Sequence, residues 1–469
     1  MLPMTPQKSI VFSFIAAVSG GFLHAEVKPN PLFTDGAVLQ QGQAIPVWGT
    51  AADGEEVTVE IAGQKASTTA KDGKWRVDLK PLEVGKPLTM TISGENTVKV
   101  ENLLVGEVWV CSGQSNMEWK QKATESAEEE RTKAKYPKIR MFTVKRTTSP
   151  VPLTEPIGRW IECSPETVGD FSAVGYYFAR ALYEKIDMPV GMIHSSWGGT
   201  PAQAWTSIEG FEGHDELKGY AAQSKANAEK FADTPPEKPL GSGVPSSLFN
   251  GMLAPVIPYA IKGVIWYQGE SNARNSKQYR TLFPAMIADW RTKWKQGPFP
   301  FFFVQIAPYK GQPPEIREAQ LLTLAKSENT AMAVTTDVGN ANDIHPKKKK
   351  PVGERLALAA RALTYGEDIE YSGPLYQSMK VVGDKVGLTF SHIGGGLVAK
   401  DGDLKGFTIA GADGKFVPAD AEIKGDMVVI SAAGVKDPKA VRYGWENVPD
   451  VNLFNKEGLP ASPFRTDVD

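Results

Sequence analysis

A serine follows an apolar stretch in the sequence VCSGQSNMEW, residues 110–119. The tripeptide Val-Trp-Val that leads into it predicts a buried strand, and the glycine and amide residues after it predict a turn carrying Ser115. Such a corner exposes the serine Oγ, and its backbone N–H groups can bind an oxyanion, as nucleophilic catalysis requires. The stretch GQSNM is not the G-x-S-x-G elbow, because Met117 holds the fifth position. Alone, it therefore fits a catalytic serine and also a serine that only shapes a turn.

A serine nucleophile needs a base, which is normally a histidine. Four of the five histidines lie beyond residue 25, and these are His194, His214, His345 and His392. The first follows an apolar strand, the second lies in an acidic stretch, and the last lies in a β-rich region. His345, in NANDIHPKKKK, is expected between a strand and a helix with Asp343 close by. It is therefore the best-placed base of the four.

The elements around these residues predict three regions. Residues 26–103 contain short β-rich runs separated by turn residues, which predicts a small sandwich. Residues 104–366 alternate strands with amphipathic helices, which predicts an α/β fold with a doubly wound, mostly parallel sheet and ligands at the carboxyl ends of its strands. Within this region the polar stretch 207–245 is expected to be an insertion. Residues 367–469 return to short β-rich runs, which predicts a second β module.

Four stretches occur in this order along the α/β region: GQSNMEW, SSWGGTPAQAW, WYQGESN and DIHP. Together they resemble the sialate O-acetylesterase family, which belongs to the SGNH-type carbohydrate esterases. The resemblance implies an SGNH-hydrolase-like sheet flanked by an N-terminal β-sandwich-like module and a C-terminal β-rich module. It also implies a serine esterase that removes O-acetyl groups from sugars and needs no metal or cofactor.

The resemblance also implies roles for particular residues. It places the nucleophile at Ser115 and the base at His345. The implied oxyanion donors are the Ser115 backbone N–H, a backbone N–H of Gly198 or Gly199, and the side chain of Gln268. The residue types agree with these roles, because glycine leaves room for an oxyanion and an amide can donate to one.

The acid of the triad is less clearly marked. The related pattern places it three residues before the histidine, where this chain has Asn342. Asp343 stands two residues before His345 and is the first choice, since a turn can bring it onto Nδ1. Glu270 is the second choice, because some related esterases resemble a Ser-His-Glu arrangement. Asp337, at the end of the preceding strand, is the third.

Several residues are expected to contact the sugar. Asn116 adjoins the nucleophile, Trp197 can stack on a sugar ring, and Arg317 can meet a carboxylate. The lysine run at 347–350 is expected to be a solvated loop that could attract an anionic sugar. Since sialic acid is anionic and xylan acetate is neutral, such cations favour O-acetylated sialic acid as the substrate. An acetyl esterase of plant polysaccharide and a non-catalytic carbohydrate-binding protein are the alternatives.

Composition limits the remaining possibilities. The formal net charge of −2 provides no electrostatic footprint for nucleic acid. Residues 1–25 have the weakly positive start, apolar run and small-residue end of a signal peptide, which predicts export to the periplasm or the medium. No later segment is long and apolar enough to predict a membrane span. The two cysteines, Cys111 and Cys163, lack metal-binding spacing and are expected to be either one disulfide or two buried thiols.

Overall fold

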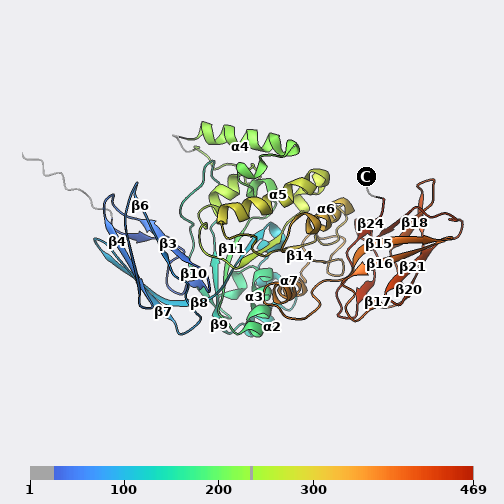
Figure 1. Cartoon of the computed structure of the whole chain (residues 1–469), viewed down its shortest axis with the longest axis horizontal. Helices are drawn as coiled ribbons and strands as arrows, with labels where there is room; N and C mark the ends of the chain where they lie inside the picture. Colours follow the sequence, from blue (N-terminus) through green and yellow to red (C-terminus); the bar gives the residue numbers. More distant parts are fainter. Residues whose placement is uncertain (1–25, 233–235, 468–469) are drawn as a thin grey trace, which may run out of the picture.

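The computed structural model describes residues 26–232 and 236–467. The signal peptide expected at residues 1–25 lies outside the described residues. Three regions lie side by side along the long axis of the molecule, with the N-terminal strands at one end and the C-terminal strands at the other (Figure 1). Between them, helices cover both faces of a central sheet (Figure 1).

The N-terminal region consists of short strands with alternating burial. In one of them the side chains of Trp75, Val77 and Leu79 are buried, whereas the intervening ones are exposed, as expected for a strand with one face on a core. The strands are β1 (Lys28–Pro29), β2 (Val38–Gln40), β3 (Ile45–Thr50), β4 (Glu56–Ile61), β5 (Gln64–Thr69), β6 (Lys74–Leu79) and β7 (Leu88–Ser93). One sheet has the order β1-β3-β6. In the other, β4 pairs with both β5 and β7, and β7 pairs with β8.

Strand β8 (Thr97–Gly113) joins the N-terminal region to the central one. Its first part pairs antiparallel with β7, and its last part pairs in parallel with strands of the central sheet. The boundary expected between residues 103 and 104 therefore falls inside a single strand. The buried apolar residues of both regions also form one continuous core.

The central region is a mixed sheet with the strand order β10-β9-β11-β8-β12-β13-β14. Its strands are β9 (Tyr136–Thr143), β10 (Trp160–Cys163), β11 (Val190–Ser196), β12 (Gly263–Tyr267), β13 (Phe301–Val304) and β14 (Thr330–Ala333). Neighbours from β9 to β14 are parallel, and only β10 is antiparallel. Chain order reverses at β8, which lies between β11 and β12. Sheets of this kind bind ligands at such a switch point, beyond the carboxyl ends of the strands.

Helices lie on the two faces of this sheet, with α5 and α6 on one side and α3 and α7 on the other (Figure 1). The helices are α1 (Ser115–Glu118), α2 (Ala127–Thr132), α3 (Ala173–Ile186), α4 (Lys218–Lys230), α5 (Ser276–Trp294), α6 (Pro314–Lys326) and α7 (Lys350–Leu363). Shorter turns are η1 (Gln121–Ala123), η2 (Val168–Asp170), η3 (Ala202–Trp205), η4 (Glu209–Phe211), η5 (Asp215–Leu217), η6 (Phe249–Leu253) and η7 (Glu270–Asn275). None of the helices in the described ranges is long and apolar enough to cross a bilayer.

The stretch expected to be an insertion contains α4, which packs near α5. The Tyr220 hydroxyl donates to Gln278 Oε1 at 2.7 Å, and the rings of Phe211 and Tyr220 lie 5.6 Å apart. This stretch therefore covers the outer side of α5, as Figure 1 also shows.

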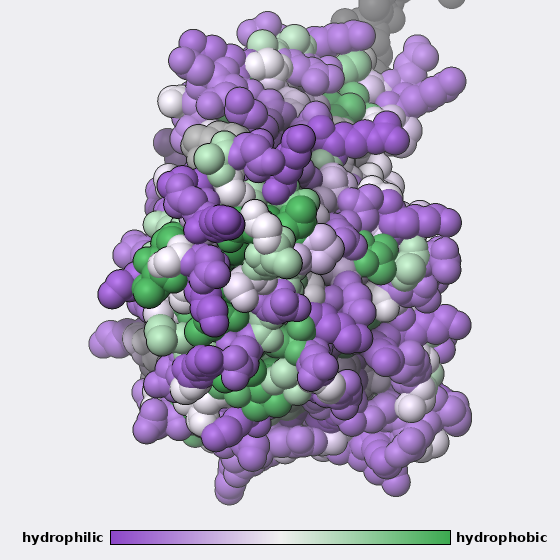
Figure 2. All heavy atoms as spheres, turned by 90° about the vertical axis from the view of Figure 1, so that its right-hand side faces the viewer, coloured by the Kyte–Doolittle hydropathy of each residue, from purple (hydrophilic) through white to green (hydrophobic). Residues whose placement is uncertain are grey.

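The C-terminal region has a separate apolar core, which includes Val386, Ile409 and Phe464. Its strands are β15 (Leu375–Val382), β16 (Lys385–Ser391), β17 (Leu397–Ala399), β18 (Phe407–Ala410), β19 (Phe416–Pro418), β20 (Asp420–Lys424), β21 (Met427–Ser431), β22 (Ala440–Tyr443), β23 (Leu453–Asn455) and β24 (Phe464–Arg465). They form two four-stranded sheets and one strand pair. Figure 2 views this end of the molecule and shows a mainly hydrophilic surface with interspersed apolar residues.

An aromatic cluster holds the N-terminal region against the central one. The rings of Phe33 and Trp48 lie 5.0 Å apart, and the ring of Tyr259, from the central region, lies 5.3 Å from Phe33. The Tyr259 hydroxyl donates to the Val38 carbonyl at 2.7 Å. Aromatic pairs of this geometry stabilise beyond their buried area.

We therefore expect Phe33→Ala to lower the free energy of unfolding by ~3–5 kcal/mol, because Phe33 is only 1% exposed and its loss leaves a cavity in the shared core. Denaturant unfolding checks this, with Val84→Ala as the control because Val84 is exposed. A loss below ~1 kcal/mol for Phe33→Ala would mean that the two regions do not depend on this junction.

Candidate active site

Strand β8 ends beside β12 at the carboxyl edge of the central sheet. Gly113, its last residue, has φ +139°, and a Cβ there would lie 2.1 Å from the Tyr267 carbonyl oxygen. Only glycine can pass this close to the neighbouring backbone. The chain then turns at Gln114, and Ser115 is the first residue of α1. This placement brings the Ser115 side chain to the edge of the sheet at its switch point.

The base expected from the sequence lies next to this serine. His345 Nε2 is 2.8 Å from Ser115 Oγ, within hydrogen-bonding distance. His345 comes from the loop between β14 and α7, and its ring stacks on Trp119 at 5.3 Å. Partial burial lowers the pKa of His345, the nearby Lys349 lowers it further, and Asp343 opposes both. The lowered pKa favours the neutral imidazole, which can accept a proton.

Asp343 lies on the other side of the imidazole. Its Oδ1 is 3.8 Å from His345 Nδ1 and accepts the His345 backbone N–H at 2.9 Å. The distance to Nδ1 exceeds that of a hydrogen bond, so the carboxylate acts on the ring through its charge in this structure. Hydrogen bonds of this kind are often long in unliganded enzymes and shorten when substrate binds.

The two other acids considered for this role have different partners. Glu270 Oε1 accepts a hydrogen bond from Asn116 Nδ2 at 2.6 Å, and burial raises the pKa of Glu270. Asp337 makes two bonds to the Arg355 guanidinium, at 2.7 and 2.6 Å. Of the three acids, Asp343 is the one that faces the imidazole.

The two glycines proposed as oxyanion donors differ in their surroundings. Gly198 lies against Ser115, since a Cβ there would be 3.2 Å from Ser115 Cβ. Its backbone N–H donates to Glu118 Oε2 at 2.8 Å and is therefore already used. Gly199 is exposed, has φ +74°, and a Cβ there would meet open space.

The Gln268 side chain, expected as an oxyanion donor, is bonded to other protein groups in this structure. It is fully buried, and its amide donates to the Thr200 carbonyl at 3.3 Å and to Asn272 Oδ1 at 2.7 Å. An amide has two N–H donors, so both are occupied. Asn272 Oδ1 also accepts the Ala202 N–H at 2.9 Å. Gln268 and Asn272 therefore hold the loop after β11 against the loop after β12.

Two of the residues expected to contact the sugar are instead buried and bonded to other protein groups. Asn116 is 1% exposed and bonds to protein groups behind the serine. Arg317 is fully buried and donates to the backbone carbonyls of Glu446 and Asn447 in the C-terminal region. Arg317 therefore attaches this region to α6 instead of binding a carboxylate. The sequence position of Arg317 predicts that it lies near the strand ends. It does not show that the side chain points toward the C-terminal region.

Trp197 is the one of the three with part of its surface exposed, and its backbone N–H donates to the carbonyl of Gly113, two residues before Ser115, at 3.2 Å. The Arg146 guanidinium lies over its ring, 5.5 Å from the centroid, and pairs with Glu118. Since Glu118 also accepts the Gly198 N–H, these residues form one cluster at the edge of the site. Arg146 was not singled out from the sequence, because it lies between β9 and β10 in a segment that contains none of the four motifs.

The lysine run is not uniformly solvated, which corrects the expectation for this loop. Lys349 is 1% exposed, whereas Lys347, Lys348 and Lys350 are exposed. Lys350 Nζ also donates to Glu130 at 2.9 Å. Because the run consists of four lysines, the sequence does not indicate which of them is buried.

The two cysteines are free, buried thiols in this structure, so of the two alternatives the disulfide is absent. Burial raises the pKa of Cys163 to about 12 and that of Cys111 further. Across residues 26–232 and 236–467, no three His, Cys, Asp or Glu side chains are grouped so as to hold a metal ion.

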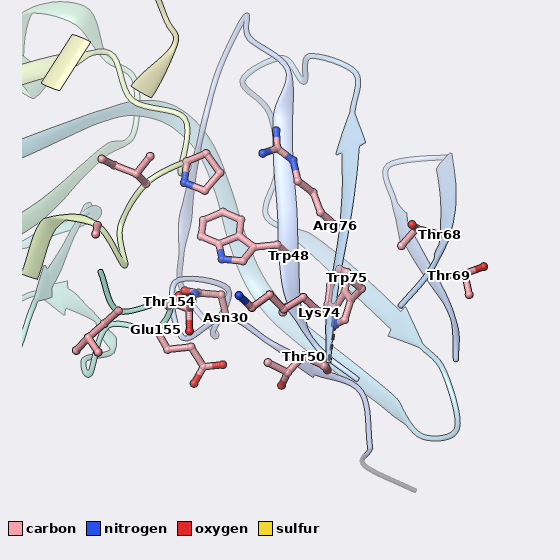
Figure 3. Close-up of a pocket in the computed structure, with 15 residues that line it drawn as sticks. Asn30, Trp48, Thr50, Thr68, Thr69, Lys74, Trp75, Arg76, Thr154 and Glu155 are labelled. Atoms are coloured by element: carbon pink, nitrogen blue, oxygen red, sulfur yellow. Dashed lines mark hydrogen bonds between the residues drawn. The ribbon is translucent and has the colours of Figure 1, made fainter. Parts of the chain in front are cut away.

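A cavity of about 490 Å³ lies away from this site, at the junction of the N-terminal and central regions. Figure 3 shows Trp48 in its wall, with Lys74 and Glu155 at its rim. Neither Ser115 nor His345 lines it. Ser115 and His345 therefore lie at the sheet edge, outside this cavity.

Comparisons with known proteins identify the family of this chain. Residues 105–362 match the family described as carbohydrate esterase, sialic acid-specific acetylesterase. The sialate O-acetylesterase of Rattus norvegicus is 33% identical over 396 residues, 72% of this chain and 73% of that protein. The human protein of the same name is 32% identical over 394 residues, 74% of this chain and 73% of that protein.

A solved structure is also similar over nearly the whole chain. The crystal structure of a carbohydrate acetylesterase from Xanthomonas citri has 37% sequence identity and a TM-score of 0.86, covering 94% of this chain and 100% of that one. This chain therefore belongs to the sialic acid-specific acetylesterase family of carbohydrate esterases, and it is a carboxylic ester hydrolase that removes O-acetyl groups from sugars.

Proposed function

We propose that this protein is an exported serine esterase of SGNH type that deacetylates sugars through an acetyl-serine intermediate, with O-acetylated sialic acid as its preferred substrate. The observation that supports it most is the 2.8 Å contact between Ser115 Oγ and His345 Nε2 at the carboxyl edge of the sheet. The pattern of residues 1–25 supports export.

The proposed reaction has two halves. Ser115 Oγ attacks the acetyl carbonyl carbon while His345 Nε2 takes the hydroxyl proton, forming a tetrahedral oxyanion. The intermediate collapses, the C–O bond to the sugar breaks, and the imidazolium returns its proton to the departing sugar oxygen. Water, deprotonated by His345, then attacks the acetyl-serine and releases acetate. Asp343 stabilises the imidazolium in both halves through its negative charge.

The proposed oxyanion donors are the backbone N–H groups of Ser115 and Gly199. Ser115 opens α1, and the first N–H groups of a helix have no helical acceptor. Gly199 follows Gly198, which lies against Ser115, and a Cβ at Gly199 would meet open space, whereas the Gly198 N–H already donates to Glu118.

The proposed preference for sialic acid rests on the family match and on one cation. Arg146 has a side chain that is 51% exposed, over Trp197 and close to the loop that adjoins Ser115. A guanidinium can bind the carboxylate of sialic acid while the Trp197 ring packs on the sugar. A neutral acetylated polysaccharide is the second candidate, because the relative from Xanthomonas citri is described only as a carbohydrate acetylesterase.

Ser115→Ala tests the nucleophile. We expect kcat on p-nitrophenyl acetate to fall by ~10⁴–10⁶, because no other group on the proposed path can form the acyl-enzyme. Circular dichroism and thermal unfolding show whether the fold is kept. Ser271→Ala is the matched control, since Ser271 is the exposed serine of GES in the loop after β12. Loss of activity in the control with retention in Ser115→Ala would refute the assignment.

The triad acid is tested by comparing Asp343→Asn, Glu270→Gln and Asp337→Asn. We expect Asp343→Asn to cause the largest loss of kcat, up to ~10⁴. Because Asp343 raises the pKa of His345, its removal lowers that pKa, and the acidic limb of kcat/KM should move to lower pH. A larger kcat loss with Glu270→Gln would reverse the order of the acids.

Substrate preference is tested with Arg146→Ala on O-acetyl sialic acid and on an acetylated xylo-oligosaccharide. We expect kcat/KM to fall about tenfold for the anionic substrate and little for the neutral one, which serves as the internal control. The preference should also shrink as salt rises, since exposed charges are screened over ~8–10 Å. A preference of the native enzyme for the neutral substrate at every salt concentration would identify it as a polysaccharide esterase.

A further inference from the structure

Lys349 is a buried cation directly behind the catalytic pair. Its side chain is 1% exposed, although its neighbours Lys348 and Lys350 reach solvent. Lysine is almost never fully buried unless its charge is compensated, because leaving water costs several kcal/mol. The contacts of this ammonium should therefore show what it does.

The Lys349 ammonium donates a hydrogen bond to Asn116 Oδ1. It also lies over two aromatic rings, 5.8 Å from the centroid of Trp119 and 5.4 Å from that of Tyr267. Cation–π contacts of this kind partly compensate for lost hydration. Trp119 in turn stacks on His345. The lysine thus touches the segment after Ser115 and, through Trp119, the catalytic imidazole.

Asn116 carries this contact to the two catalytic segments. It directly follows Ser115, and its Nδ2 donates to the carbonyl of Ile344, the residue before His345, at 3.0 Å. The same nitrogen donates to Glu270 Oε1 at 2.6 Å. Both N–H donors and the oxygen of Asn116 are therefore engaged, which fixes the amide in one orientation.

We propose that Lys349 is a positioning residue, which through Asn116 keeps the backbone at Ser115 and the backbone at His345 in the arrangement that forms their hydrogen bond. Deleting the ammonium leaves Asn116 Oδ1 without its partner, which loosens the amide and weakens its bond to the Ile344 carbonyl. This inference rests on the proposed roles of Ser115 and His345. It assigns Lys349 no contact with the substrate.

The charge of Lys349 has a second effect on the same pair. Four titratable side chains lie around the Lys349 ammonium. Glu270 and Tyr267 come from the end of β12 and the turn after it, and Asp343 and His345 come from the loop that precedes α7. Burial lowers the pKa of Lys349 to about 7, against the opposing pull of Glu270 and Asp343. In its charged form it lowers the pKa of His345 and so favours the neutral imidazole. Removing this charge should raise the pKa of His345.

The test compares Lys349→Met with Lys348→Met, an exposed neighbour of the same type. For Lys349→Met we expect kcat on p-nitrophenyl acetate to fall ~10²-fold with KM nearly unchanged, because the catalytic groups are displaced but the ester site is not. The acidic limb of kcat/KM should move to higher pH, the direction opposite to that for Asp343→Asn. Lys348→Met should match the native enzyme in both measurements.

A second variant separates positioning from a general loss of stability. Asn116→Ala breaks the same link at its other end, so its kcat loss should be similar, and the double variant should lose little more than either single one. Thermal unfolding of each variant shows that the fold is kept. If Lys349→Met unfolds, the kcat of Asn116→Ala decides the matter.

Native kcat and an unmoved acidic limb in folded Lys349→Met would overturn the proposal, and so would native kcat in Asn116→Ala. Fully additive losses in the double variant would also overturn it, because the two residues would then act separately. Ser115→Ala distinguishes this failure from failure of the proposed function. If that variant is inactive while Lys349→Met is native-like, only the positioning role is wrong.

Discussion

The contact between Ser115 and His345 joins residues 230 positions apart in the chain, and the topology of the central sheet makes it possible. Strand β8 lies between β11 and β12, so chain order reverses there and the loops at the carboxyl ends of the strands diverge around it. The chain leaves this strand at Gly113, two residues before Ser115. A Cβ at Gly113 would lie 2.1 Å from the Tyr267 carbonyl oxygen, so only glycine fits there. A bulkier residue at Gly113 would push the turn away from β12 and open the distance to the imidazole.

Behind this contact lies a set of buried polar groups that is costly to assemble. Glu270, Asn116 and Lys349 are almost removed from water, and burial moves the pKa of the glutamate up and that of the lysine down. Replacing such a set with apolar side chains is often neutral or favourable for stability. Its presence next to Ser115 and His345 therefore favours a role in geometry over a role in stability. The same reasoning applies to Gln268 and Asn272, whose amides hold two strand-end loops together.

The flanking regions are attached in different ways. The N-terminal strands share β8 and one apolar core with the central sheet, so that part of the molecule is continuous with the frame of the site. The C-terminal strands have their own core and are attached through polar contacts, among them Arg317 to the Glu446 carbonyl and Gln305 to Ser462 Oγ at 2.9 Å. A buried arginine donating to backbone carbonyls explains why Arg317 is not available to a substrate.

The sequence alone determined that the central region alternates strands with helices and which residue types are candidates for the reacting centre. Alternation of strands and helices predicts the central sheet, because period and length are local properties. The four ordered motifs identify the family, and they single out Ser115 and His345 as the candidate nucleophile and base. Asp343 could be ranked first among the acids, because two residues of loop are enough to bring it near the imidazole.

Only the tertiary structure decided which polar side chains near Ser115 are bonded to buried protein groups. Asn116 follows Ser115, and Gln268 lies in another of the four motifs. In both side chains the amide N–H groups donate to buried protein groups. Lys349 does not differ from its neighbours in type, and its burial depends on two rings and an amide from other segments. The burial of a side chain and its hydrogen-bond partners depend on residues that are distant in the chain. A local sequence pattern therefore does not predict them.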